Sequence, residues 1–358
     1  MNKLIYLDII PSELHQVMNE KGILVKNYQP KLAPKKIVET YKKMVVGREV
    51  DKKMMQWQRI GKMLTFAPNL GEEALQFGCA LAMDKKRDWL VPAFRSFHLM
   101  NELGVEIWQL FLYWNGNEKG SRFFDNVNVL PINITIGAQM SQAAGLGYAF
   151  SLKRKKSVAV TFIGDGGTSE GEFYESMNLA AIYNWPVVFC INNNQWSIST
   201  PREKESKVVD LSIKGIAAGV HRARVDGNDL LASYDVMVEA LEHARSGKGP
   251  VLVEFVTYRQ GPHTTSDDPT IYRTKEEEEE WMKKDPIDRL YKYLVSHNLW
   301  SIEDQDKLIE NSKSFIQEQY DQMVLMNNTS IDDIFNHTYE TLPDDLQEQK
   351  KIAKKYFE

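Results

Sequence analysis

The sequence has few of the features that mark secreted, membrane-spanning or zinc-binding proteins. Only two of its 358 residues are cysteine, Cys79 and Cys190, and their wide separation argues against a zinc-ligand pattern or a disulfide framework. We therefore expect reduced thiols and a cytoplasmic protein. No apolar run approaches the roughly 20 residues that a membrane-spanning helix needs. The short apolar patch near the N-terminus ends at Asp8, so we expect no signal peptide.

Positive charge is not in excess either. The 44 Lys and Arg residues are outnumbered by 49 Asp and Glu residues, which argues against nucleic acid or an anionic membrane as a partner. The basic cluster at residues 153–156 follows a small-residue segment that we expect to be helical, and cations are favourable at the end of a helix. The five glutamates at residues 276–280 follow Thr274 with capping-box spacing, which indicates a solvated helix start rather than a metal site.

What is present is a strand–helix–strand pattern in the middle of the chain. Residues 158–163 and 186–191 are apolar runs typical of buried parallel strands, and the segment between them has helical apolar spacing. A polar cluster follows each run. Because parallel strands end at the same edge of a sheet, we expect Asp165 and Asn194 to lie close together. The pattern predicts an α/β fold with a mainly parallel sheet, helices on both faces and a helical C-terminal region.

The first polar cluster is a glycine-rich loop without a cation. Gly164, Gly166 and Gly167 allow a ligand close to the backbone, and the helix that follows offers free N–H groups to a phosphate. The loop contains Asp165 and no Lys or Arg, so a bare phosphate would be repelled. A divalent cation held by carboxylate and carboxamide oxygens would resolve this conflict, and Mg²⁺ or Ca²⁺ suits such ligands. The loop lacks the Gly-Lys-Ser/Thr of a Walker motif, and Ser169 replaces the third glycine of a dinucleotide fingerprint.

The wider pattern resembles a known family. The string Gly-Asp-Gly-Gly-Thr-Ser-Glu-Gly-Glu-Phe-Tyr-Glu at 164–175 is followed by Asn193-Asn194 and by Ile-Ser-Thr-Pro at 198–201. This combination is similar to the thiamine diphosphate signature of alpha subunits of the decarboxylating first component of 2-oxo acid dehydrogenase complexes. The resemblance is strongest to the bacterial pyruvate dehydrogenase type. It covers residues 46–288.

The resemblance implies site residues as well as cofactors, thiamine diphosphate and Mg²⁺. It implies Mg²⁺ ligation by Asp165, Asn194 and the carbonyl of Trp196. It implies cofactor binding by Phe94, Arg95, Ile134, Ile136, Asp165, Gly166, Gly167 and Asn194. In this set the isoleucine carbonyls face the aminopyrimidine, and Phe94 replaces the commoner tyrosine. The resemblance makes His263 the catalytic residue that reaches the reacting carbonyl carbon.

Other polar residues near these motifs receive structural interpretations. Glu72 and Glu73 lie in a turn that the family places near the active-site mouth, and both open a predicted helix. We interpret them as partners of the helix dipole rather than as catalytic groups. His98 has no evident chemical partner in the sequence, and we interpret it as structural.

The resemblance implies oxidative decarboxylation of pyruvate with reductive acetylation of the lipoyl group on an acyltransferase component. Branched-chain 2-oxo acid and acetoin dehydrogenases are alternatives, and a non-catalytic phosphate-binding interaction protein is an alternative of another class. We divide the chain into an N-terminal arm (1–36), a thiamine diphosphate-binding domain (37–285) and a C-terminal helical region (286–358). The sequence shows no second series of strand–helix units for an aminopyrimidine domain. We therefore expect a beta subunit to supply it, in a heterotetramer of two alpha and two beta chains.

Overall fold

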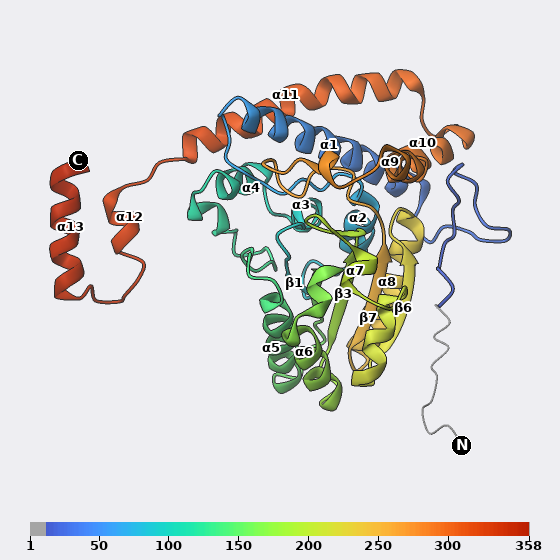
Figure 1. Cartoon of the computed structure of the whole chain (residues 1–358), viewed down its shortest axis with the longest axis horizontal. Coiled ribbons are helices and arrows are strands. Elements are labelled where there is room, and N and C mark those ends of the chain that lie inside the picture. The colour runs from blue at the N-terminus through green and yellow to red at the C-terminus, as the bar shows by residue number, and fades with distance from the viewer. Residues whose placement is uncertain (1–11, 358) are drawn as a thin grey trace.

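The structure is a computed structural model that describes residues 12–357. Its centre is a sheet of five parallel strands in the order β1-β2-β3-β7-β6 (Figure 1). The strands are β1 (Trp89–Val91), β2 (Ala159–Gly164), β3 (Val187–Asn193), β6 (His221–Asp226) and β7 (Val251–Val256). A separate antiparallel pair follows β3 and consists of β4 (Trp196–Ser197) and β5 (Thr200–Pro201). The predicted parallel α/β sheet is confirmed.

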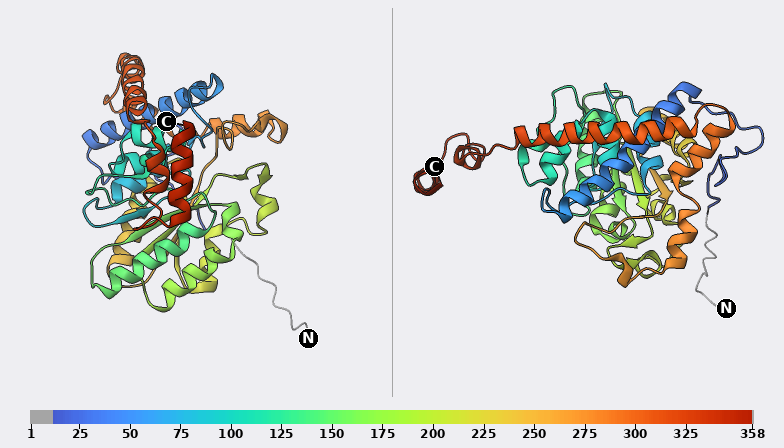
Figure 2. Two further views of the ribbon diagram at one scale, coloured as in Figure 1. Left: turned by 90° about the vertical axis from the view of Figure 1, so that its left-hand side faces the viewer. Right: turned by 90° about the horizontal axis from the view of Figure 1, so that it is seen from above.

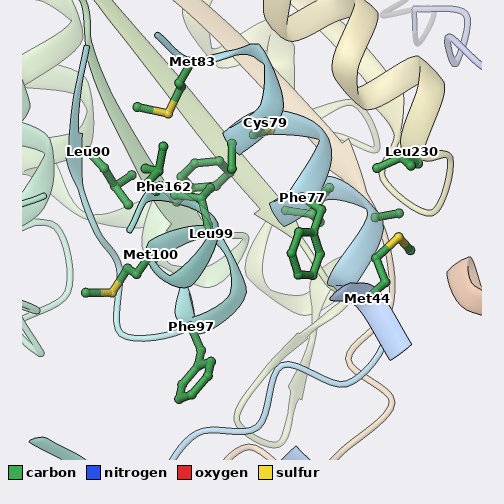
Figure 3. Close-up of a cluster of buried hydrophobic side chains, with 14 of the residues drawn as sticks. Met44, Phe77, Cys79, Met83, Leu90, Phe97, Leu99, Met100, Phe162 and Leu230 are labelled. Carbon is green, nitrogen blue, oxygen red and sulfur yellow. The ribbon is translucent and has the colours of Figure 1, made fainter. Parts of the chain in front are cut away.

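Side chains of the sheet alternate between two cores. In β2, Val160 and Phe162 belong to one apolar cluster, whereas Ala159 and Ile163 belong to the other. Because both faces are covered, the central strands β2 and β3 are mostly apolar, whereas the edge strand β6 carries several polar side chains. Figure 3 shows the larger cluster, where Phe162 lies among side chains such as Leu90 and Leu99. Deleting one such buried aromatic side chain costs about 3–5 kcal/mol.

Helices cover both faces of the sheet, as the sequence predicts. The larger core lies beneath α1 (Pro34–Arg59), α2 (Glu73–Ala82), α3 (Phe97–Leu103), α4 (Ile107–Trp114) and α8 (Leu230–Arg245). The smaller core lies beneath α5 (Ala138–Leu152), α6 (Gly171–Ile182) and the 3₁₀ helix η3 (Leu211–Ala218). Three shorter pieces lie in loops: η1 (Glu118–Ser121), η2 (Gly166–Ser169) and α7 (Arg202–Glu205). Asp229 caps α8 by accepting the N–H groups of Leu231 and Ala232.

The region after β7 is helical. It contains η4 (Pro269–Ile271), α9 (Lys275–Met282), α10 (Pro286–Ser296), α11 (Ile302–Met326), α12 (Ile331–Phe335) and α13 (Asp344–Phe357). Thr274 caps α9 by accepting the N–H of Glu277, as the spacing predicts. Helix α11 lies along α1, and α12 and α13 project from one end of the molecule (Figures 1 and 2). The helical C-terminal region is confirmed, and the domain division at residue 285 remains a prediction.

The described part of the N-terminal arm lies on this chain's own sheet. His15 forms a parallel bridge with Val225 beside β6. The carboxylate of Asp229 accepts the N–H groups of Val17 and Met18 at 2.8 and 2.7 Å. Residues 1–11 of the predicted arm lie outside the described residues.

Two further expectations concern what the chain does not contain. Between residues 12 and 158 the only strand is β1, and the described residues from 257 to 357 contain no strand. The described chain therefore has a single parallel sheet. Among the residues that the structure describes, no helix combines the length and apolarity needed to cross a bilayer.

Candidate active site

A cavity of about 160 Å³ opens at the carboxyl edge of β2 and β3, where open α/β sheets bind ligands. Its lining combines the two polar clusters with segments from three loops. The lining residues are Ala93, Phe94, Arg95, Ile136, Phe162, Ile163, Gly164, Asp165, Gly166, Gly167, Asn192, Asn194, Trp196, Ser197, Ile198 and His263. The structure thus brings together every predicted site residue except Ile134, which is exposed and does not line the cavity.

The glycine loop approaches its neighbours too closely for side chains. A Cβ on Gly166 would lie 2.0 Å from Ser197 Oγ, and one on Gly167 would lie 2.6 Å from Ile163 Cγ1. The loop continues as η2 before α6 begins at Gly171. The first free N–H groups after β2 therefore belong to this short 3₁₀ turn, one turn earlier than the predicted helix. The backbone at Gly166 and Gly167 forms a cradle that only glycine fits.

Asp165 is a buried carboxylate with an oxygen that has no partner. Its side chain is 3% exposed, and Oδ2 makes no hydrogen bond. Burial raises the pKa of Asp165 to about 7, against the effect of nearby backbone N–H groups and Arg259. A bound cation would satisfy Oδ2 and restore the charged form.

Asn194 presents its amide with a defined orientation. Its Nδ2 donates to Glu72 Oε1 at 2.8 Å, which leaves Oδ1 on the opposite side, within 3.4 Å of the backbone N of Trp196. No group of three or more His, Cys, Asp or Glu residues in the described chain could hold a metal. A cation here would instead use one carboxylate, one carboxamide and backbone oxygen, which are hard ligands of the kind that Mg²⁺ accepts together with phosphate oxygens. The residues present fit that group.

The carbonyl of Trp196 has a partner that the sequence did not reveal. Arg259 Nη1 donates to this carbonyl at 3.1 Å, and Nη2 donates to the carbonyl of Ile198 at 2.8 Å. The side chain of Arg259 is fully buried, and burial together with Arg95 and Arg273 lowers its pKa to about 10. The predicted metal ligand Trp196 thus lies at the cavity with its carbonyl against a guanidinium.

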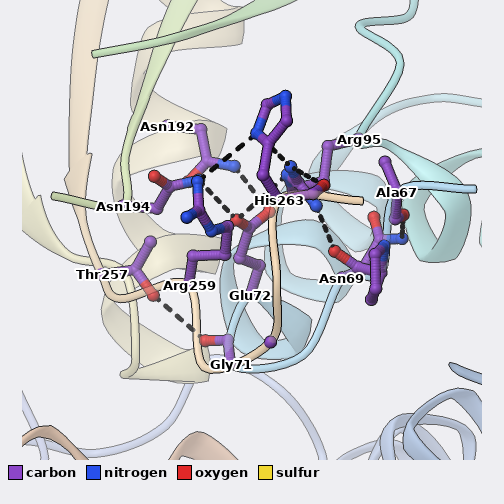
Figure 4. Close-up of polar contacts among 12 residues, drawn as sticks. Ala67, Asn69, Gly71, Glu72, Arg95, Asn192, Asn194, Thr257, Arg259 and His263 are labelled. Carbon is purple, nitrogen blue, oxygen red and sulfur yellow. Dashed lines mark hydrogen bonds and ion pairs between the residues drawn. The ribbon is translucent and has the colours of Figure 1, made fainter. Parts of the chain in front are cut away.

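Arg95 supplies a second buried positive charge. It donates to the carbonyl of Pro68. It also donates to the carbonyl of His263 at 2.8 Å (Figure 4). Its Nε lies 3.8 Å from Glu72 Oε1. A third cation lies behind the glycine loop, where Lys214 Nζ donates to Thr168 Oγ1 at 2.7 Å. The cations missing from the loop sequence are therefore brought to it from distant segments, and they provide charge for an anion.

His263 is held by these arginines. Its Nδ1 lies 3.3 Å from Arg95 Nη2 and 3.4 Å from Arg259 Nη1. Both neighbours are obligatory donors, so Nδ1 must accept and the ring proton must be on Nε2. Burial and the two guanidinium charges lower the pKa of His263 to about 4. The backbone N–H of His263 donates to Asp267 Oδ2 at 2.7 Å, which fixes the loop.

Glu73 lies in the first turn of α2, as the interpretation as a dipole partner expects, whereas Glu72 precedes the helix and does not cap it. Glu73 forms an ion pair with Arg48. Glu72 is fully buried and accepts from Asn192 Nδ2 at 2.6 Å as well as from Asn194 (Figure 4). Burial raises the pKa of Glu72, and Arg95 opposes that effect. These partners come from α1 and β3, so local helix-start chemistry could not identify them.

Sequence reasoning missed the site roles of Glu72 and Arg259. The acidic turn at Glu72 stands out in the sequence, but nothing near it points to the asparagines. Arg259 follows the apolar run at residues 251–256, which forms β7, and this position after a strand is the signal that could have indicated it. His98 is buried, with Nε2 3.6 Å from Asp51 Oδ2, in agreement with a structural role.

The fold and the cavity define an α/β protein with a cavity at the carboxyl end of its parallel sheet, lined by acidic, basic and carboxamide side chains. Comparison with known sequences identifies the protein family within this class. The family model described as "Dehydrogenase E1 component" matches residues 41–326. The chain belongs to this family, whose enzymes depend on thiamine diphosphate.

Curated relatives match over almost their whole length. The chain is 54% identical over 349 residues to the "Pyruvate dehydrogenase E1 component subunit alpha" of Mycoplasma genitalium, with 97% of each chain covered. It is 46% identical over 345 residues to the protein of the same name from Acholeplasma laidlawii, with 96% of this chain and 98% of the relative covered. The Staphylococcus aureus protein of that name is 38% identical, with 96% and 93% covered.

Proposed function

We propose that this chain is the alpha subunit of a pyruvate dehydrogenase. It acts with thiamine diphosphate and Mg²⁺ in the oxidative decarboxylation of pyruvate, and the acetyl group passes to a lipoyl group of the acyltransferase component. The observation that carries the proposal is the charge arrangement of one cavity, which is lined by Asp165 with its unpartnered Oδ2, by Asn194 and by the buried Arg95. A second buried arginine, Arg259, donates to the carbonyl of the lining residue Trp196. The similarity to three pyruvate dehydrogenase alpha subunits supports pyruvate as the substrate.

The chain's residues divide into a cation-binding set and an anion-binding set. Asp165 and Asn194 would hold Mg²⁺ through their oxygens, together with the carbonyl of Trp196. Arg95 and the N–H groups of the glycine cradle would bind the diphosphate, and Arg259 adds positive charge. When bound, thiamine diphosphate supplies the carbanion chemistry of decarboxylation. The protein contributes positioning, charge and exclusion of water.

His263 acts as a hydrogen-bond donor in this proposal. The low pKa keeps its imidazole neutral at pH 7, and the arginines at Nδ1 place the proton on Nε2. A fixed Nε2–H can donate to a substrate oxygen as negative charge develops on it. A doubly protonated ring would be opposed by both arginines, so His263 orients and stabilises the substrate without itself carrying a charge.

The site also requires a second polypeptide. The described chain has one parallel sheet, and it contains no second α/β unit to contact the aminopyrimidine. Ile134 and Ile136 are 53% and 43% exposed on the loop beside the cavity, which leaves that side available to a partner. We propose that a beta subunit covers it in a heterotetramer of two alpha and two beta chains. The two buried free cysteines suit a cytoplasmic complex.

The test is an assay of the assembled alpha–beta enzyme with thiamine diphosphate, Mg²⁺ and a lipoylated acceptor. Pyruvate, 2-oxoisovalerate and acetoin are compared as substrates at equal concentrations. The proposal predicts the highest kcat/KM for pyruvate. A higher value for either alternative would reassign the substrate, and failure to bind thiamine diphosphate would refute the proposed function as a whole.

A further inference from the structure

Three consecutive asparagines, the last two residues of β3 and Asn194 directly after it, donate hydrogen bonds to two buried carboxyl groups on opposite faces of the sheet. Asn192 and Asn194 both donate to Glu72, at 2.6 and 2.8 Å. Asn193 points the other way and donates to Glu254 at 2.6 Å. Both glutamates have 0% exposure. Successive side chains of a strand alternate in direction, which explains why one run needs two separate acceptors.

Only one of these carboxylates acts on a residue of the cavity. Asn192 and Asn194 line the cavity, whereas Asn193 does not. An asparagine amide can rotate to exchange its oxygen and nitrogen, and only one of the two orientations presents oxygen to a cation. Both carboxyl oxygens of Glu72 accept amide N–H groups, one from Asn192 and one from Asn194. Glu72 therefore holds the orientation in which Asn194 directs its nitrogen toward the carboxyl group and its oxygen away from it.

We propose that Glu72 is a positioning residue that orients the carboxamide of Asn194 for Mg²⁺ ligation. The inference rests on the proposed function, because it concerns the Mg²⁺ site of that enzyme. Glu72 itself is not a ligand in this account, since its two oxygens are already used by Asn192 and Asn194. Outer partners that orient a metal ligand typically change metal affinity by about 10- to 100-fold when they are removed.

Substitutions at Glu72 separate orientation from charge. Glu72→Ala removes the acceptor and frees Asn194 to rotate. Glu72→Gln keeps a carbonyl oxygen where Asn194 donates. Its new N–H₂ meets Asn192, whose Oδ1 has no partner and becomes an acceptor when that amide rotates. Orientation therefore predicts that Glu72→Gln recovers most of the affinity lost in Glu72→Ala. A role through negative charge beside Arg95 predicts that both variants fail equally.

Glu254→Ala is the matched control. It removes an equally buried carboxylate from the neighbouring asparagine, with the same general risk to stability, but it leaves Glu72 and the two cavity asparagines unchanged. All variants are prepared as the assembled alpha–beta enzyme. The readout is the Kd of Mg²⁺ measured by calorimetry in the presence of thiamine diphosphate, with thermal unfolding recorded in parallel.

The expected result is a loss of Mg²⁺ affinity of about 10-fold or more in Glu72→Ala, substantial recovery in Glu72→Gln and a near wild-type Kd in Glu254→Ala. Unchanged affinity in Glu72→Ala, or an equal loss in Glu254→Ala, would overturn the positioning role. If Glu72→Ala does not fold, a loss of about 10-fold in Glu72→Gln alone would overturn it. A wild-type enzyme without Mg²⁺-dependent cofactor binding would instead refute the proposed function.

Discussion

Replacing Asp165 by Asn should stabilise the chain in the absence of cofactor and abolish cofactor binding. In the folded chain, burial raises the pKa of Asp165 to about 7 from its ordinary value of 3.8. The folded state therefore binds a proton more tightly than the unfolded state, so this group contributes stability at low pH that is lost as the pH rises from about 4 to about 7. Near pH 7.5 the ionised side chain opposes folding.

The magnitude follows from the shift. About three pKa units correspond to about 4 kcal/mol. An asparagine removes this penalty, but its N–H₂ group finds no acceptor in the same place, which costs about 1–3 kcal/mol. We expect a net gain of about 2 kcal/mol in the free energy of unfolding at pH 7.5, and little gain at pH 5.

Urea unfolding of the cofactor-free chain at the two pH values measures the first effect. Calorimetry with thiamine diphosphate and Mg²⁺ measures the second. Asp210→Asn is a suitable control, because Asp210 is buried but already accepts hydrogen bonds from Ser212 and Arg222, so its replacement should destabilise the fold. A cofactor-free Asp165→Asn chain that is less stable than wild type at pH 7.5, or one that binds cofactor normally, would refute the reasoning.

Four further predictions concern the same site and its assembly. His263→Ala should retain cofactor affinity but slow lipoyl acylation by about 100-fold, the effect of losing one oxyanion donor, and full turnover would remove His263 from the mechanism. The pKa of His263 falls from 6.5 to about 4 in the folded state, so between pH 7 and pH 5 a proton binds this residue only in the unfolded chain. Wild type should therefore lose about 1 kcal/mol more stability than His263→Asn over this interval, after allowance for the partial exposure of the ring, and equal losses in urea unfolding would contradict the assignment. Gly166→Ala should prevent cofactor binding, since its Cβ would lie 2.0 Å from Ser197 Oγ, and an unchanged Kd by calorimetry would show that the cradle is not the binding surface. Finally, the chain purified without a second subunit should not decarboxylate pyruvate at saturating thiamine diphosphate and Mg²⁺, and full activity would refute the two-chain site.

The sequence by itself determined the sheet and the places where ligands approach it. Apolar runs bounded by polar clusters specify buried parallel strands, because covered strands exclude polar side chains on both faces. The glycines at 166 and 167 and the neighbouring Asp165 could also be identified from local sequence. The glycines allow the backbone to come close to a ligand, and the acidic loop at Asp165 needs a counter-charge. Almost all of the predicted site residues therefore line one cavity.

Only the tertiary structure decided what those residues contact. Glu72 meets Asn194 across 122 positions of sequence, and Arg95 meets His263 across 168. Hydrogen bonds over such separations have no periodicity and no local spacing, so a residue such as Glu72 looks like an ordinary helix start until the chain has folded. The burial of a side chain likewise cannot be read from the local sequence. Burial depends on every element packed around a group. It raises the pKa of Asp165 and lowers the pKa of His263, so that the His263 ring is a neutral donor.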